Sequence, residues 1–135
     1  MTMRAYASRE TAALLQRLAA QVDRAAASAD ADSIHDLRVV IRRLSRCLRL
    51  FAQFYPDRAW RKLRQQLGRL MDAAGAVRDL DIAIALLAQA GIAARAAAVV
   101  RMSAERRKRS SAFLAEVGRW RGHHWTRGWR RKLEL

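Results

Sequence analysis

Apolar residues recur at three- and four-residue spacing along most of the chain, which is the periodicity of helices with one buried face. The segment DADS interrupts this pattern after the first helix, and Ser33 has the residue type of an N-cap for the next one. No stretch shows the alternation of a strand or an internal repeat, so the pattern predicts an all-α protein. In the first helix, over residues 8–28, we expect the buried positions to be Thr11, Leu14, Leu15, Leu18, Val22, Ala25 and Ala26.

Further helices are expected wherever the apolar stripe resumes. They cover residues 34–54, 57–74 and 77–90, with a long fifth segment from Ile92. Pro56 fits a helix start, whereas Gly75 and Gly91 fit helix stops. Because the connections are short, successive helices should run antiparallel. The expected fold is an up-and-down antiparallel four-helix bundle with a long additional C-terminal helical segment.

Composition supports one domain over residues 1–135. The chain is 52% hydrophobic and contains one proline and six glycines, so a packed helical core is expected. Cys47 is the single cysteine and falls on an apolar helix face, where it should pack in the core. No run approaches the ~20 apolar residues of a membrane span, and the first residues lack a signal-peptide pattern. A cytoplasmic protein is expected.

Charge narrows the class of partner. Lys and Arg number 27 against 12 Asp and Glu, which gives a formal net charge of +15, and only three of the bases are lysines. A field of this size repels itself unless anions are near, so we expect a polyanionic partner. Residues 101–135 hold eleven bases and three acids, and residues 31–55 hold five bases and two acids.

A basic row lies along one face of the second helix. His35, Arg38, Arg42, Arg46 and Arg49 fall within about 80° of one another and extend over about 20 Å. Arg43 sits beside this row, and no acidic residue occurs between positions 37 and 56 to relieve the repulsion. A solvated face normally mixes signs, so the row favours an anion-binding ridge over the alternative of a solubility surface. Guanidinium groups suit phosphate because each can donate two parallel hydrogen bonds.

The third helix repeats this theme more weakly. Arg58, Lys62, Gln65 and Arg69 share one side of it, with Arg61 and Arg64 on a flank. If the second and third helices are antiparallel neighbours, the two stripes form the walls of one basic groove. The alternative is that this side of the third helix simply faces solvent.

Two segments resemble the CHAD family, the conserved histidine α-helical domain. IHDLRVVIRRLSRCLRLF, residues 34–51, is similar to its histidine motif, and AAGAVRDLDIAIALL is similar to its RDLD element. A weaker third likeness is SAFLAEVGRWRGHHW. Ser45 stands where many relatives carry a longer basic residue.

The resemblance implies an all-helical domain that binds inorganic polyphosphate, often in association with polyphosphate granules. It implies that His35 is the histidine of the family name, and that Arg78 and Asp79 match the RD pair. It also implies that a second helical half is missing here, so either two chains pair to rebuild the site or the chain is one half of something larger. The exposed second side of a half-domain favours a homodimer. The residues predicted to bind polyphosphate are His35, Arg38, Arg42, Arg43, Arg46, Arg49, Arg58, Lys62, Arg69 and Arg78.

The sequence contains no recognisable catalytic set, cofactor motif or metal site. Its four glutamates are far apart, and His123 and His124 are adjacent, so on a helix they point about 100° apart. We therefore expect a non-enzymatic protein without a cofactor. An alternative is a nucleic-acid-binding protein, because the C-terminal tail interleaves Trp125 and Trp129 with basic residues. The same tail would also suit an anionic membrane surface, or its tryptophans would complete a core or a dimer interface.

Overall fold

The computed structural model describes residues 1–122 and 124–135, and the regular elements in these ranges are all helical. The all-α prediction is therefore confirmed. The elements are α1 (Met3–Ala27), α2 (Ala31–Leu50), the short 3₁₀ helix η1 (Ala52–Phe54), α3 (Asp57–Gln89), α4 (Ala97–Gly118) and α5 (His124–Lys132).

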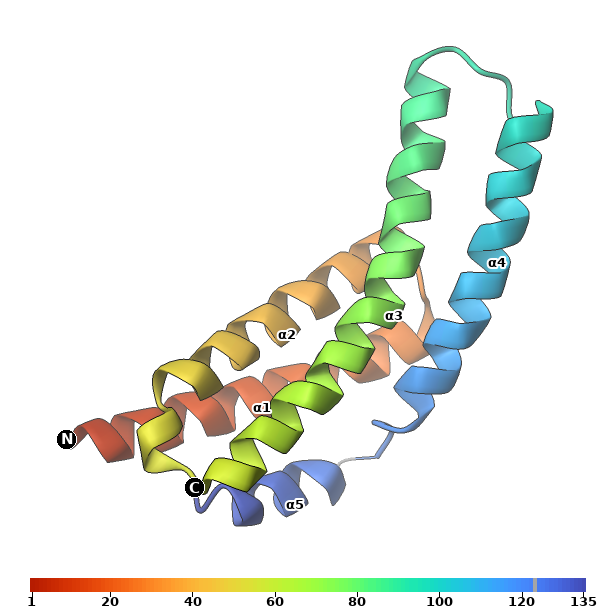
Figure 1. The fold of residues 1–135 in the computed structure, drawn as a ribbon. Coiled ribbons are helices and arrows are strands. Elements are labelled where there is room, and N and C mark those ends of the chain that lie inside the picture. The colour runs from red at the N-terminus through yellow and green to blue at the C-terminus, as the bar shows by residue number, and fades with distance from the viewer. Residues whose placement is uncertain (123) are drawn as a thin grey trace.

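Two helical hairpins form the fold (Figure 1). Helices α1 and α2 pack against each other, as do α3 and α4, and α2 also packs against α3. Figure 1 shows the first hairpin lying across one half of the second, while the other ends of α3 and α4 project beyond it. The short α5 returns to contact α1. The projecting part is called the arm below and comprises residues 79–101.

Helix α3 corrects the prediction of two helices separated at Gly75. It runs without interruption for 33 residues, and Gly75 lies inside it. Ala74 and Val77 are buried and continue the stripe of Leu67 and Leu70, so packing outweighs the roughly 1 kcal/mol that an interior glycine costs. The fourth helix of the fold is therefore made by Ala97–Gly118. Gly91 does end α3 as predicted, with a φ of 80° that favours glycine.

Helix starts follow the expected capping chemistry but not always the expected residue. The side chain of Thr2 accepts a hydrogen bond from the Ala5 amide and starts α1 earlier than residue 8. At α2 the N-cap is Asp30 and not Ser33, since Asp30 accepts from the Ser33 amide at 2.8 Å. These hydrogen bonds to Ser33 lower the pKa of the Asp30 carboxyl. Ser33 is instead buried, and its hydroxyl donates to the carbonyl of Ser28.

A single core joins all five α-helices. Its fully buried side chains come from α1, α2, α3 and α4, and α5 adds Trp129. The inward face predicted for α1 is confirmed, except that Ala26 is only partly buried, and Met71 of α3 is likewise partly buried. The largest fully buried residues are Leu15, Leu18, Ile34, Leu37, Ile41, Leu44, Leu48, Leu63, Leu67, Leu70, Phe113 and Leu133.

One buried polar cluster joins α1 and α2 to the connection between η1 and α3. The Thr11 hydroxyl contacts both the Tyr55 hydroxyl and the Cys47 thiol, and Tyr55 donates to the carbonyl of Ala7 at 3.2 Å. Burial raises the pKa of the Cys47 thiol and of the Tyr55 hydroxyl. Cys47 is therefore a core residue, as predicted.

Arg106 of α4 ties the base of the arm to the first hairpin. Its Nε donates to Asp81 of α3 at 2.6 Å, and its Nη2 donates to the carbonyl of Ala29 in the α1–α2 connection at 3.0 Å. The two side chains of the ion pair are 26% and 14% exposed, so this pair is shielded from solvent. A shielded pair is sensitive to the loss of one partner because the other charge is left without compensation.

We predict that Arg106→Ala lowers the free energy of unfolding by about 2 kcal/mol, because Asp81 and the Ala29 carbonyl both lose their donor. Urea unfolding followed by circular dichroism measures this. Arg107→Ala is the control, since Arg107 is exposed, and it should change stability by no more than about 0.5 kcal/mol. Equal effects of the two substitutions would contradict the proposed tie.

Candidate polyanion-binding site

The basic row of α2 lies on the solvent side of the helix. Its opposite face carries the buried Leu37, Ile41, Leu44 and Leu48, which fix the rotation of α2 about its axis. Four members of the row are therefore exposed, and Arg38 is partly buried. The exposed members are His35, Arg42, Arg46 and Arg49.

Arg38 reaches from α2 to α3. A Cβ built at Gly75 would lie 4.0 Å from Nη2 of Arg38, so the guanidinium rests over this glycine. The Nε of Arg38 is buried and has no hydrogen-bond partner within the described part of the chain. Leaving a buried donor without an acceptor costs folding free energy. The guanidinium of Arg38 can therefore donate to an anion from outside the chain without giving up a contact within it.

Arg64 of α3 has the same property, and the sequence pattern did not single it out as a binding residue. Its Nε is also buried without a partner among the described residues. One flank of α3 carries residues spaced by four, seven and three positions, which brings them to the same side of a helix. They are Arg64, Gly68, Gly75 and Arg78. Because Arg38 rests over Gly75, this flank faces α2. We call this region, with Arg38, Arg64 and Arg78, the α2–α3 seam.

The remaining predicted residues lie away from the seam. Arg43 lies on the α1 side of α2, in a depression shared with Arg17 and Asp36. Arg58 and Lys62 line a depression formed by α3 alone. The basic groove predicted from Arg58, Lys62 and Arg69 is therefore wrong in its α3 wall, because the buried stripe of α3 turns these residues away from α2.

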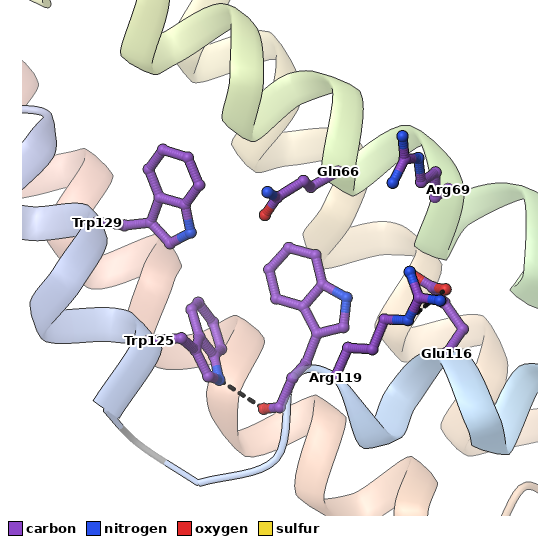
Figure 2. A pocket seen from close by; sticks show the side chains of 7 residues that line it. Gln66, Arg69, Glu116, Arg119, Trp125 and Trp129 are labelled. Carbon is purple, nitrogen blue, oxygen red and sulfur yellow. Dashed lines mark hydrogen bonds and ion pairs between the residues drawn. The ribbon is translucent and has the colours of Figure 1, made fainter.

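Arg69 instead lines a cavity of about 230 Å³ on the other side of α3 (Figure 2). The cavity is closed by the end of α4 and by α5, and it is lined by Gln66, Arg69, Glu116, Arg119, Trp120, Trp125 and Trp129. Trp120 and Trp129 are each 5% exposed, and Trp125 is partly buried. The tail tryptophans thus complete the core, which was one of the alternatives left open by the sequence.

Acidic residues do not neutralise the predicted site. Within residues 1–122 and 124–135, no ion pair involves His35 or any of the nine predicted basic residues. Two carboxylates that lie next to these residues in the sequence are paired with other arginines, Asp36 with Arg24 and Asp57 with Arg61. The basic residues of the α2 row and the α2–α3 seam are therefore not paired with carboxylates within the described part of the chain.

Within the described residues, no group of three or more His, Cys, Asp or Glu side chains is arranged to hold a metal ion. His124 begins α5, and His123 lies outside the described residues. None of the described helices combines the length and the apolar character that crossing a bilayer requires.

These features define an all-helical protein with an arginine-rich face. Within the described residues, the arginines of this face form no ion pairs with carboxylates of the chain. The family model described as CHAD domain matches residues 10–134, so the chain belongs to the CHAD domain family. The match includes α2, α3, α4 and α5 entirely and most of α1. No match was found among curated proteins or among solved structures.

We predict that Arg38→Met raises the free energy of unfolding by about 1 kcal/mol without anions, because it removes a buried donor that has no acceptor. Thermal unfolding followed by circular dichroism measures the change. Arg42→Met is the matched control, since Arg42 is exposed on the same helix and its loss should be nearly neutral. A destabilisation by Arg38→Met larger than that by Arg42→Met would show that Arg38 is a structural residue.

Proposed function

We propose that the protein binds inorganic polyphosphate without chemically changing it, along the α2 row and the α2–α3 seam. The observation that carries the proposal is the pair of buried Nε atoms of Arg38 and Arg64, which have no acceptor among the described residues and adjoin a row of exposed arginines. Membership of the CHAD domain family, which is known for polyphosphate binding, supports the choice of polyanion.

The geometry suits a linear phosphate chain. Arg38, Arg42, Arg46 and Arg49 follow one another along α2, with one guanidinium for about every 5 Å of helix. Each exposed guanidinium can donate two parallel hydrogen bonds to a phosphate. The partly buried guanidinium groups of Arg38 and Arg64 have Nε atoms that are already shielded from solvent. Since binding would displace counterions from the polyanion, affinity should fall as salt concentration rises.

Binding without turnover is proposed because the surface has donors but few acids. Hydrolysis by a carboxylate-based site would need acidic groups beside the phosphate chain. The α2 sequence from Leu37 to Leu50 has no acidic residue, and Asp81 of α3 is paired with Arg106. A cytoplasmic location with association to polyphosphate granules follows as part of the same proposal.

Nucleic acid is the alternative polyanion, through the basic α5. An extended strand has little to stack on at the outer surface of α5, because Lys132 covers one face of the Trp129 ring at 4.6 Å and Trp125 is partly buried. Ending the chain at Ser103 is not a clean test of this alternative, since it would remove Phe113 and Val117 from the core. Competition with intact protein separates the two polyanions instead.

We predict that Arg42→Glu with Arg46→Glu weakens polyphosphate binding at least about 100-fold, because two charge-assisted contacts are replaced by repulsion. The measurement is a titration of labelled long-chain polyphosphate near physiological salt, with circular dichroism to show unchanged helicity. Single- and double-stranded nucleic acid then compete at equal phosphate concentration, and polyphosphate should resist displacement.

The matched control is Arg101→Glu with Arg107→Glu, which changes the net charge equally on the exposed side of α4. It should weaken binding far less. If both double variants lose the same affinity, the protein reads only total charge and the site assignment fails. If nucleic acid displaces polyphosphate equally well, the polyphosphate assignment fails.

A second copy of the chain is the proposed partner for the arm. Ile82, Leu86 and Val100 are exposed apolar side chains on it, and in a two-fold contact one such patch covers its own copy. This continues the homodimer expected from the resemblance.

We predict that the protein sediments as a dimer near physiological salt and that Leu86→Lys makes it monomeric, because the substitution places a charge in the contact. Leu50→Lys is the control, since Leu50 is an exposed leucine outside the arm. Sedimentation equilibrium distinguishes the states. A monomeric unsubstituted protein, or equal effects of both substitutions, would exclude the arm as a self-association surface.

A further inference from the structure

The cavity between α3, the end of α4 and α5 is a second feature that the polyphosphate proposal does not use. Figure 2 shows the indoles of Trp125 and Trp129 on one side of it, with Gln66 and Arg69 arriving from α3 and Arg119 and Glu116 from α4. Trp120 packs edge-on against Trp125 with ring centroids 5.1 Å apart. Trp125 is held in place by its Nε1, which donates to the Trp120 carbonyl at 2.5 Å.

The polar lining of this cavity has unused hydrogen-bonding capacity. Gln66 is partly buried, and its amide forms no hydrogen bond within the described residues. The Glu116 side chain is 17% exposed, and its contact with Arg119 is long, at 3.8 Å. An amide and a carboxylate can together donate to and accept from the edge of one planar ligand.

The charges at the cavity exclude one class of aromatic-cage ligand. Aromatic cages bind cations over their rings, but here Arg69 and Arg119 outnumber the single carboxylate of Glu116. The whole chain also has a net charge of +15. A cation is therefore disfavoured, and an anionic group is favoured at the edge where the two arginines lie.

We propose that this cavity binds the base of a nucleotide, with its phosphate on Arg69 and Arg119. Three indoles supply an aromatic wall, Gln66 and Glu116 face the polar edge of the base, and the two arginines supply phosphate donors. A volume of about 230 Å³ is below the ~300–1,000 Å³ of sites for drug-sized ligands, so only the base enters and the phosphate stays at the rim. Inorganic phosphate alone would leave the aromatic wall unused.

The ligand chemistry is shared by a free nucleotide and by one residue of a single-stranded nucleic acid. Either source presents a base joined through a sugar to phosphate. An ionised carboxylate such as that of Glu116 can only accept hydrogen bonds, so bases that carry an amino group are favoured. This proposal does not depend on polyphosphate binding, because the cavity lies on the opposite side of α3 from the α2–α3 seam.

The test is a titration of the full chain with adenosine monophosphate, followed through the indole N–H signals of its four tryptophans by nuclear magnetic resonance. We expect the signals of Trp120, Trp125 and Trp129 to shift. Trp60 is the internal control, since its indole is bonded to Asp57 at the start of α3 and does not line the cavity. Ribose 5-phosphate is the matched ligand control because it has the sugar and phosphate without the base.

Arg69→Gln should weaken adenosine monophosphate binding roughly tenfold, whereas Arg101→Gln, an exposed arginine of α4, should have little effect. A short single strand of deoxyadenylate that shifts the same three indoles identifies nucleic acid as an additional source of the base. The proposal is overturned if neither adenosine monophosphate nor the strand shifts these signals, or if ribose 5-phosphate binds as tightly as adenosine monophosphate.

Discussion

The apolar contact of α2 with α1 and α3 is the constraint on which the rest of the structure depends. Leu37, Ile41, Leu44 and Leu48 are fully buried in it, and each contributes roughly 1.5–3 kcal/mol by its burial. Repulsion between neighbouring arginines of the row costs only a few tenths of a kcal/mol per pair. The core therefore holds like charges in a line that they would not adopt by themselves, and their spacing is inherited from the helix.

Two carboxylates of the chain join helices, and within the described residues none forms an ion pair with the α2 row. Asp36 pairs with Arg24 between α1 and α2, and Asp81 pairs with Arg106 between α3 and α4. Each of these contacts fixes one hairpin. Because acids are placed at such joints, the α2–α3 seam keeps guanidinium groups whose positive charge is available to a ligand. The arginines that join helices and the arginines proposed to bind polyphosphate are thus different residues, although they are alike in sequence.

Periodicity predicted the helical class, the first two helices and most of their buried faces. It failed at Gly75 because local propensity carries about 1 kcal/mol, whereas the buried stripe from Leu67 to Val77 continues through that position. The α2 row was readable because all its members lie on one helix. The surroundings of Arg64 could not be predicted from the sequence, since they depend on where α2 crosses α3. The position of Arg69 could not be predicted either, because a tertiary contact places it among tryptophans.

The arm has a consequence for motion. Its helices are covered on fewer sides than the rest of the molecule, and Leu86 and Val100 are more than half exposed. Local opening needs less free energy where fewer apolar contacts must be broken, so backbone amides here should exchange with solvent sooner than those of the core. Arg106 sits at the boundary and limits how far such opening spreads. The arm is therefore expected to be the first part of the molecule to open.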